Sequence, residues 1–422
     1  MAGARRTPWV WMVFVAVVGV VLIAAAVFVT VRITAALPRA TVSIQSPTTL
    51  LVDRGAPPPI PLPARGSFAL ATSLNGMVAS RNPAVVRPIG SVAKAMTALV
   101  VLAAHPVTPG EPGPSVTLTG ADVLLYRQAV AAGGSNLRVR AGEVLTERDL
   151  LLALLLPSAD NIAETLAVWV SGNRPAFIAS LNATATAMGM DHTHFADPSG
   201  LSVATVSSAD DLVLLARAVI ANPALAELVR VRQYTLPDRT ILRNLDILLD
   251  KQSGWLGIKT GWTGAAGGCL VFAATMSYAP DRAVTVWGAV LGQPPLRAGD
   301  PAHPELGEAF VAARNAAVAA LAGYAAVDLG ALSPAVSGSI STRWGGRSFV
   351  ALARHATDVV LLHAGAKLRL DVVTLSPRAP IASGATVGEI TGVLDANTSI
   401  TWKVVSTSAV AAPSTWWKLF SG

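Results

Sequence analysis

Cysteine is almost absent from this chain of 422 residues, and charged side chains are few. The single cysteine, Cys269, excludes an intramolecular disulfide and any metal site built from paired cysteines. Charged residues make up 14% of the chain and hydrophobic residues 52%, which excludes a mostly disordered protein because there is enough apolar side chain to fill a core. No lysine or arginine run forms the basic stripe typical of nucleic-acid binding. The sequence therefore predicts folded domains that bind no nucleic acid.

Acidic residues are missing from the first forty positions, and one stretch there carries no charge at all. Residues 7–31 would span about 37 Å as a helix, enough to cross a hydrocarbon core of about 30 Å. Arg5 and Arg6 precede the stretch, which favours a cytoplasmic N-terminus and an extracytoplasmic remainder. We therefore predict a cell-membrane protein with a cytoplasmic stub and one transmembrane signal-anchor helix over 1–36. Cleavage of the segment at the small residues that follow it is the alternative.

Proline is concentrated directly after this helix, and the composition changes again further on. Residues 37–66 hold seven prolines, which predicts an extended linker because proline fixes φ and removes a backbone donor. Strand-like and helix-like segments mix over 67–325, and short β-like runs between Gly, Pro and Ser follow over 326–410. An aromatic tail over 411–422 would suit a membrane interface. The sequence thus predicts an α+β domain followed by a small β domain.

The clearest local pattern lies in the middle of the α+β region. Thr146, with Asp149 three residues later, forms a capping pattern before seven consecutive apolar residues, so we expect a buried helix there. Pro157 ends this helix, and a second helix begins near Asp160. Further helices are expected at 210–221 and 308–322, and strands at 257–259, 269–275 and 283–291. The last two strands are almost wholly apolar, which predicts a central place in the sheet.

Ser91 and Lys94 open another apolar stretch and stand three residues apart. On a helix, residues i and i+3 share a face, so this spacing places an amine beside a hydroxyl. A serine hydroxyl is a poor nucleophile until a base removes its proton, and a lysine can be that base when burial lowers its pKa. Taken alone, the pattern also fits an ordinary exposed lysine near a helix start.

Two more polar groups follow at wide spacing. Ser158 and Asp160 come directly after the apolar helix and its proline, where they either line a cleft or cap the next helix. Lys259 and Thr260 lie at a strand end, where they can hold a carboxylate, and Gly261 lets a ligand lie close against the strand. The alternative for this last group is a surface lysine beside a turn. Only six lysines occur in the chain, and two of them fall in these motifs.

The order S-x-x-K, S-x-D, K-T-G is close to the trio of motifs of penicillin-binding proteins and class A β-lactamases. The sequence resembles the low-molecular-mass penicillin-binding proteins that act as serine-type D-alanyl-D-alanine carboxypeptidases, over roughly residues 67–300. The likeness extends to the segments 188–190, 194–201, 208–212, 243–244 and 259–270. It implies a β-lactamase/transpeptidase-like domain, in which an antiparallel sheet has helices on both sides and an all-helical subdomain. The region after 326 looks like the second domain of some members.

The resemblance implies acyl transfer on peptidoglycan stem peptides that end in D-Ala-D-Ala, with β-lactam antibiotics as inhibitors. Ser91 attacks the carbonyl of the penultimate D-alanine, Lys94 takes its proton, and Ser158 relays a proton to the leaving D-alanine. Water then hydrolyses the acyl-enzyme. No metal or cofactor is implied, because the nucleophile is a serine and the base an amine.

The implied substrate-binding residues are Asp160, Lys259, Thr260, Gly261 and Trp262. Lys259 and Thr260 would bind the terminal carboxylate of the peptide. The backbone N–H groups of Ser91 and Trp262 match the positions of the family's oxyanion hole.

One position departs from the family's pattern. Asp160 stands where the family usually has asparagine, and Asn161 comes next. An ionised aspartate accepts hydrogen bonds but cannot donate one, and its charge would favour the protonated form of Lys94. The departure bears on the efficiency of acylation rather than on the fold.

Other functions fit parts of the same pattern. A β-lactamase is one, but the glutamates between the second and third motifs, Glu164 and Glu227, lie in no E-x-x-L-N arrangement that would supply a deacylating base. A catalytically weak or inactive membrane-anchored scaffold that has kept the fold is another. An endopeptidase that cuts cross-links would use the same chemistry. His192 and His194 form an H-x-H pair, which we interpret as structural.

Overall fold

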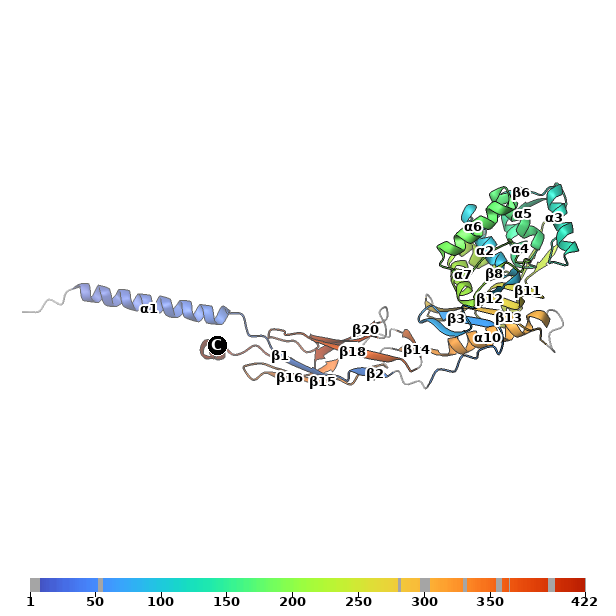
Figure 1. The fold of residues 1–422 in the computed structure, drawn as a ribbon. Helices are drawn as coiled ribbons and strands as arrows, with labels where there is room; N and C mark the ends of the chain where they lie inside the picture. The colour runs from blue at the N-terminus through green and yellow to red at the C-terminus, as the bar shows by residue number, and fades with distance from the viewer. Residues whose placement is uncertain are drawn as a thin grey trace, which may run out of the picture. The chain divides into compact units, whose positions relative to one another are not determined.

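The computed structural model describes residues 8–51, 56–279, 282–296, 304–328, 332–353, 359–363, 365–393 and 399–421. The chain divides into two compact units (Figure 1), one of them Pro57–Tyr324 and the other formed by Met1–Ala56 with Ala325–Gly422. The domain boundaries predicted from the sequence lie near residues 66 and 325.

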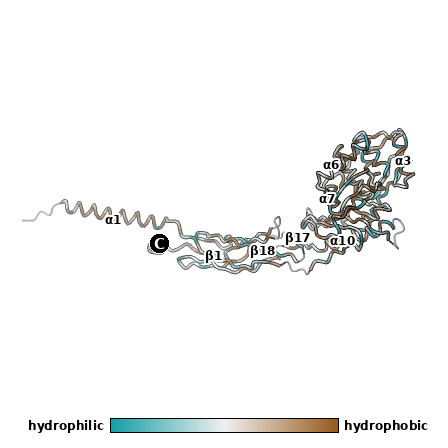
Figure 2. Tube along the Cα trace, viewed as in Figure 1, coloured by the Kyte–Doolittle hydropathy of each residue, from teal (hydrophilic) through white to brown (hydrophobic). Residues whose placement is uncertain are grey.

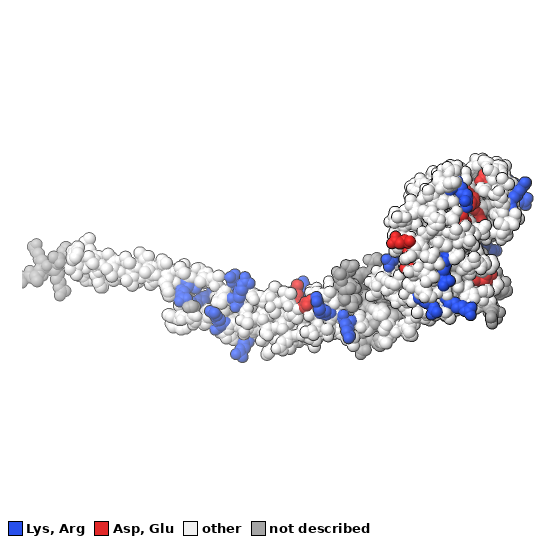
Figure 3. Space-filling view, viewed as in Figure 1, with Lys and Arg blue, Asp and Glu red and all other residues white. Residues whose placement is uncertain are grey.

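Helix α1 (Pro8–Thr34) forms over the uncharged N-terminal stretch, and Arg32 in its last turn is its one charged residue. The colouring in Figure 2 shows that its residues are largely hydrophobic, and Figure 3 shows that most of its length is free of charge. Within the described chain, Trp9–Thr34 is the one helix long and apolar enough to cross a membrane. Of the expected span at 1–36, residues 8–34 are therefore helical.

The same unit contains a seven-stranded sheet in the order β1-β15-β16-β20-β19-β18-β2. Its strands are β1 (Thr41–Gln45), β2 (Thr49–Leu51), β15 (Ser337–Ser341), β16 (Arg347–Leu352), β18 (Lys367–Thr374), β19 (Thr386–Val393) and β20 (Ser399–Ser406). A separate pair joins β14 (Tyr324–Asp328) and β17 (Val359–His363), and α11 (Thr415–Phe420) lies in the aromatic tail. The sheet buries apolar side chains around Trp402.

The proline-rich segment 37–66 differs from the extended linker that its composition predicts. Strand β1 pairs with β15 and β2 pairs with β18, so this part of the segment lies in the sheet of the C-terminal β region (Figure 1). The prolines of 37–51 flank these two strands instead of interrupting them. A strand whose partner lies some 300 residues away leaves no pairing pattern in the local sequence, so the composition of this segment predicted only a linker.

The unit Pro57–Tyr324 is built on a five-stranded antiparallel sheet in the order β11-β12-β13-β3-β4. These strands are β11 (Trp255–Thr263), β12 (Gly267–Ala279), β13 (Arg282–Gln293), β3 (Ser67–Thr72) and β4 (Gly76–Arg81). As predicted, β12 and β13 are interior strands. Along β3, Phe68 and Leu70 pack into the core that includes α10, whereas Ala69 and Ala71 face the core of the helical region. Both faces of the sheet are therefore covered by helices (Figure 1).

Most helices of this unit lie on one face of the sheet, and α10 covers the other (Figure 1). The helices are α2 (Ala93–Ala104), α3 (Gly120–Ala131), α4 (Glu147–Leu155), α5 (Asp160–Ser171), α6 (Arg174–Ala187), α7 (Ala209–Ala221), α8 (Pro223–Leu228), α9 (Leu248–Lys251) and α10 (Gly307–Ala322), with short 3₁₀ turns η1 (Gly90–Val92) and η2 (Pro304–Leu306). Short strand pairs join β5 (Arg87–Pro88) with β8 (Val206–Ser207), β6 (Ser115–Thr117) with β7 (Val144–Thr146), and β9 (Gln233–Thr235) with β10 (Ile241–Arg243).

The buried helix expected after Thr146 is confirmed as α4. The Thr146 N–H donates to Asp149 Oδ2 at 2.9 Å, and the Asp149 N–H donates back to Thr146 Oγ1 at 3.1 Å. This reciprocal capping satisfies two backbone donors that the helix itself leaves unpaired. The helix ends just before Pro157, and α5 begins at Asp160, as predicted.

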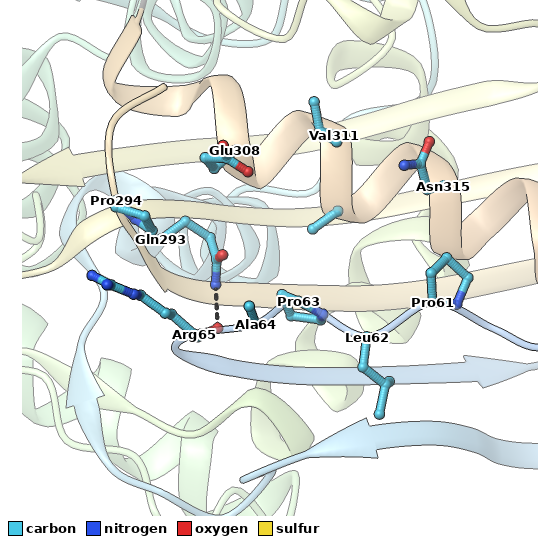
Figure 4. Close-up of a pocket in the computed structure, with 11 residues that line it drawn as sticks. Pro61, Leu62, Pro63, Ala64, Arg65, Gln293, Pro294, Glu308, Val311 and Asn315 are labelled. Atoms are coloured by element: carbon cyan, nitrogen blue, oxygen red, sulfur yellow. Dashed lines mark hydrogen bonds between the residues drawn. The ribbon is translucent and has the colours of Figure 1, made fainter. Parts of the chain in front are cut away.

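The last part of the proline-rich segment packs against the α+β unit. Residues 61–65 and α10 enclose a cavity of about 290 Å³ (Figure 4). The side-chain amide of Gln293 donates to the Arg65 carbonyl oxygen at 2.8 Å and fixes the segment beside the end of β13. This hydrogen bond holds the chain where it enters β3, the strand next to β13.

Glu147 is a buried acidic residue of the same unit. Its side chain is fully buried at the start of α4, and neither carboxylate oxygen has a hydrogen-bond partner among the described residues. Burial raises the pKa of Glu147 from 4.5 to about 7. Between these two pH values the unfolded chain carries the charge and the folded chain does not, so the stability of the fold falls as the pH rises through the window.

We expect Glu147→Gln to remove this pH dependence, because an amide stays neutral at every pH. The variant should gain more in Tm over the unsubstituted protein at pH 8 than at pH 4, measured by thermal unfolding of the full chain in detergent. Glu308→Gln is the matched control, since Glu308 also lies in a first helical turn but is partly exposed. An equal Tm difference at both pH values for Glu147→Gln would contradict the assignment.

Candidate active site

The Ser91–Lys94 pair lies where η1 passes into α2, and the lysine side chain is completely buried. Lys94 Nζ donates to three acceptors: Ser91 Oγ at 2.8 Å, Asp160 Oδ1 at 2.6 Å and the Ser199 carbonyl oxygen at 2.8 Å. These acceptors come from three segments that are far apart in the sequence. The amine is thus fixed beside the hydroxyl by contacts that leave it no freedom to move away.

The protonation of Lys94 is set by two opposing effects. Burial lowers the pKa of Lys94, because the interior disfavours the charged form, and the Asp160 carboxylate raises it in part. A neutral amine at this place has a lone pair for the Ser91 proton while its two N–H groups still donate to Asp160 and Ser199. The geometry therefore suits proton removal from Ser91 by Lys94.

Asp160 ends the second motif and Asn161 directly follows it, but the two side chains have different roles. The Asn161 side chain accepts from the Leu137 N–H at 2.9 Å and donates to the Leu137 carbonyl at 3.0 Å, so it fixes a loop and does not reach Lys94. Asp160 is the residue that contacts the lysine. A Cβ at Gly134 would lie 2.2 Å from Asp160 Oδ2, which shows how closely that loop approaches the carboxylate.

Ser158 is held in an unusual backbone conformation. Its φ of 67° lies in the left-handed region, which costs a non-glycine residue about 1–2 kcal/mol. Its side chain is buried, and its hydroxyl has no hydrogen-bond partner in the described part of the chain. The structure thus leaves the Ser158 hydroxyl free of Lys94 and Lys259, with its hydrogen-bonding capacity unused. Strain and an unpaired buried hydroxyl in one residue are typical of functional positions.

The third motif lies within β11, with Lys259 and Thr260 both buried. Lys259 Nζ donates to the Thr260 carbonyl oxygen at 3.0 Å. Burial, together with the nearby charge of Lys94, lowers the pKa of Lys259 well below its ordinary value. An anionic ligand would reverse this shift, because an opposite charge favours the ammonium form. The strand can therefore bind a carboxylate beside Lys94.

Glycines let β11 approach η1 closely. A Cβ at Gly261 would lie 2.7 Å from the Ile89 carbonyl oxygen and 3.1 Å from the Ser91 nitrogen. A Cβ at Gly90, whose φ is +54°, would lie 3.1 Å from the Trp262 nitrogen. The backbone nitrogens of Ser91 and Trp262 therefore lie on the two sides of the close contact between η1 and β11. The Trp262 side chain is half exposed.

No sequence motif predicts a site role for Ser199, whose backbone oxygen is one of the three acceptors of Lys94. Its position is fixed by neighbours: the Ser199 hydroxyl and the Leu201 N–H donate to Asp197 Oδ2, and Thr97 donates to the Pro198 carbonyl oxygen at 2.6 Å. A backbone acceptor can belong to any residue type, so no residue pattern identifies it from the sequence.

The histidine pair has no part in this cluster. His192 lies near the carboxylates of Asp210 and Asp211, with ligand-type atoms within 4.8 Å of one another, whereas the His194 backbone pairs with Val206. Asp211 accepts from the His192 N–H at 2.8 Å and from the Thr193 hydroxyl at 2.6 Å. The group ties a loop to the start of α7, and the two aspartates are acidic neighbours of His192 that the sequence spacing did not predict.

Known proteins similar to this chain share the α+β unit. The signature of the D-alanyl-D-alanine carboxypeptidase family matches residues 64–290. A D-alanyl-D-alanine endopeptidase of Pseudomonas aeruginosa is 33% identical over 247 residues, covering 56% of this chain and 76% of that protein. The D-alanyl-D-alanine carboxypeptidase DacB2 of Mycobacterium tuberculosis is 33% identical over 215 residues, covering 49% of this chain and 69% of that protein.

A solved structure shows the same likeness. The crystal structure of the Streptomyces K15 DD-transpeptidase is 26% identical, with a TM-score of 0.52, and the match covers 61% of this chain and 98% of that one. The sequence signature, the curated relatives and the solved structure thus agree with the resemblance that the three motifs carry. This chain belongs to the D-alanyl-D-alanine carboxypeptidase family.

Proposed function

We propose that the protein removes the terminal D-alanine from peptidoglycan stem peptides through an acyl-enzyme on Ser91. The observation that carries this proposal is the 2.8 Å contact between Ser91 Oγ and the buried Nζ of Lys94. A serine hydroxyl next to a buried amine with a lowered pKa is an activated nucleophile, because the amine can take its proton. The membership of the chain in the D-alanyl-D-alanine carboxypeptidase family supports the choice of substrate.

In the first step Ser91 Oγ attacks the carbonyl carbon of the penultimate D-alanine, and its proton passes to Lys94 Nζ. The negative charge that forms on the carbonyl oxygen is bound by the backbone N–H groups of Ser91 and Trp262. A donor of this kind typically contributes about 3–4 kcal/mol to lowering the barrier. The C–N bond then breaks, and the leaving D-alanine nitrogen takes a proton through the unpaired hydroxyl of Ser158.

The terminal carboxylate of the peptide binds Lys259 and Thr260 on β11, while Asp160 and Gly261 line the same groove. In the second step a water molecule attacks the ester carbonyl, its oxygen becomes part of the new carboxyl group, one of its protons passes to Ser91 Oγ, and the shortened peptide leaves. β-Lactams enter the same path because their amide carbonyl is open to Ser91, and they acylate it. No step requires a metal or an organic cofactor.

We propose the following domain organisation: a cytoplasmic stub and signal-anchor helix over 1–36, the penicillin-binding domain over 67–325 and a β domain over 326–410 that also includes β1 and β2. Arg5 and Arg6 support a cytoplasmic N-terminus by the positive-inside rule. The groove at Ser91 is then extracytoplasmic, on the side of the membrane where peptidoglycan lies. The aromatic tail over 411–422 is proposed to contact the membrane interface.

Cleavage of cross-links is a second candidate, because the similar protein of Pseudomonas aeruginosa is a D-alanyl-D-alanine endopeptidase. The acyl-enzyme on Ser91 would be the same, and only the leaving group would differ. Purified cross-linked and uncross-linked muropeptides, digested in parallel and separated by liquid chromatography, distinguish the two activities.

We expect Ser91→Ala to abolish covalent labelling by fluorescent penicillin, because Ser91 Oγ is the one side-chain hydroxyl hydrogen-bonded to Lys94 within the described part of the chain. Mass spectrometry of the full chain should show a single penicilloyl adduct in the unsubstituted protein and none in the variant. Ser180→Ala, which changes a half-buried serine on α6, is the matched control and should label fully. Absence of any adduct in the unsubstituted protein would favour the scaffold function, and rapid turnover of a chromogenic cephalosporin would favour a β-lactamase.

We expect Asp160→Asn to shift the acidic limb of the pH–acylation profile to lower pH. The carboxylate favours the ammonium form of Lys94, so its removal lets the lysine become a neutral base at lower pH. Acylation by penicillin near neutral pH should then become several-fold faster, as measured by stopped-flow fluorescence.

Asp160→Ala is the comparison variant for this experiment. It removes the same charge but also the hydrogen-bond acceptor at 2.6 Å, so acylation should be slower than in Asp160→Asn at every pH. A profile of Asp160→Asn that coincides with that of the unsubstituted protein would show that the carboxylate does not control Lys94.

A further inference from the structure

Basic side chains gather at one end of the C-terminal β region, the end that follows α1 along the chain. Figure 3 shows lysine and arginine side chains there, with no acidic side chain among them on the face drawn. Four segments meet at this end, and none of them contains an aspartate or a glutamate: 35–40, 342–346, 376–381 and 410–421. Each segment carries one basic residue, and together we call these residues the basic collar: Arg39, Arg343, Arg378 and Lys418.

Two of the collar residues, Arg39 and Arg378, lie side by side. Their backbones pair across an antiparallel bridge. Arg39 Nη1 donates to the Ser376 carbonyl oxygen at 3.3 Å, and Arg378 Nε donates to the Leu37 carbonyl oxygen at 3.1 Å. Both side chains are exposed, and neither forms an ion pair with any residue that the structure describes. Two positive charges are thus held close together by neutral acceptors, an arrangement that attracts an anion.

The other two collar residues belong to segments that are joined to this pair. Ile381 pairs with Val410 across a second bridge. Trp344 Nε1 donates to the Ala411 carbonyl oxygen at 3.0 Å, and the Trp344 ring contacts the ring of Trp417 on α11 with 5.4 Å between centroids. The turn that carries the third arginine and the helix that carries the lysine are therefore held at the same end of the sheet.

The chain connection keeps this end of the sheet close to the end of α1. Helix α1 has 27 residues, which is about 40 Å of helix against a hydrocarbon core of about 30 Å. The backbone from Thr34, where α1 ends, to Leu37, which is bound to Arg378, can extend about 10 Å at most. With α1 across the bilayer as proposed, the collar lies near the depth of the lipid phosphates. Trp416 and Trp417 suit the same depth, because an indole combines apolar surface with a polar N–H.

We infer that the basic collar binds the phosphate groups of anionic phospholipids in the leaflet where α1 ends. The inference rests on the proposed transmembrane anchor and adds a lipid preference to it. A second copy of the same surface is a poor occupant, because four positive charges without an acidic residue in their segments repel their like. A soluble anion would meet the charges alone, whereas a phospholipid also meets the apolar and indole surface of α11 beside them.

Lipid retention by the full chain measures this preference. The protein is reconstituted into nanodiscs that hold equal amounts of phosphatidylglycerol and phosphatidylcholine, and native mass spectrometry counts the lipids that stay bound when the disc is removed. We expect phosphatidylglycerol to be retained about tenfold over phosphatidylcholine, the effect of one or two basic side chains at an anionic surface. Equal retention of the two lipids would overturn the inference without any variant.

Paired substitutions then assign the preference to the collar. Arg39→Gln with Arg378→Gln should lower the ratio of the two retained lipids about fivefold. Arg39→Lys with Arg378→Lys keeps both charges but not the guanidinium hydrogen bonds, so it should retain most of the ratio and separates a charge effect from a structural one. Lys367→Gln with Lys403→Gln removes two exposed charges from strands of the same sheet and should leave the ratio unchanged. A ratio that survives the paired glutamine substitutions at the two arginines would refute the collar.

Failure of the inference and failure of the proposed anchor give different results. If the chain does not enter nanodiscs of phosphatidylcholine alone, the anchor is wrong and the inference falls with it. If the chain enters these discs but retains both lipids equally from the mixed discs, the anchor stands and the collar is refuted. Soluble poly(glycerol phosphate) should not displace phosphatidylglycerol, and its displacement would show that the collar takes a wall polymer instead of a lipid.

Discussion

The buried amine of Lys94 is the interaction on which the rest of the site depends. Its Nζ contacts Ser91 from η1, Asp160 from the start of α5 and Ser199 from a loop, so three separate segments must be in place before it is held. A buried lysine is costly unless it is neutral or paired, and here the two conditions compete. Burial favours the neutral base, and Asp160 favours the ammonium. The chemistry of the protein depends on the balance between them.

Close backbone contact is the second constraint, and it explains why glycine occupies three positions around Ser91. A Cβ at Gly261 would meet the Ile89 carbonyl, and one at Gly200 would lie 1.8 Å from the Gly90 carbonyl oxygen. Without side chains at these positions, β11 and the loop after Pro198 can both lie against η1. The strand thereby brings Lys259 to the groove, and the loop brings the carbonyl that Lys94 requires. Packing of main chain on main chain thus determines where the catalytic side chains meet.

Local features of the fold were readable from the sequence, and features made by distant pairing were not. Thr146 with Asp149, and Pro157 after an apolar run, act within one or two helical turns, so they predicted α4 and α5 correctly. Strands β1 and β2 pair with partners some 300 residues away, and their proline-rich surroundings suggested only a linker. At the site, the motifs identified Ser91, Lys94 and Lys259. They also assigned the last position of the second motif to Asp160 rather than Asn161. Asp160 contacts Lys94, whereas Asn161 is held by a hydrogen-bond pair with the Leu137 backbone.

Asp160 is one of several carboxylates that control the basicity of Lys94. Its Oδ1 is bound to Lys94 Nζ, and Glu164 is likewise paired with Arg174. Asp197 and Glu164 act on Lys94 in the same direction as Asp160, because each carboxylate favours the ammonium form and so opposes proton removal from Ser91. The Arg174 guanidinium lies 2.9 Å from Glu164 and partly offsets the charge of that carboxylate, which leaves Asp160 as the main group that opposes the effect of burial on Lys94.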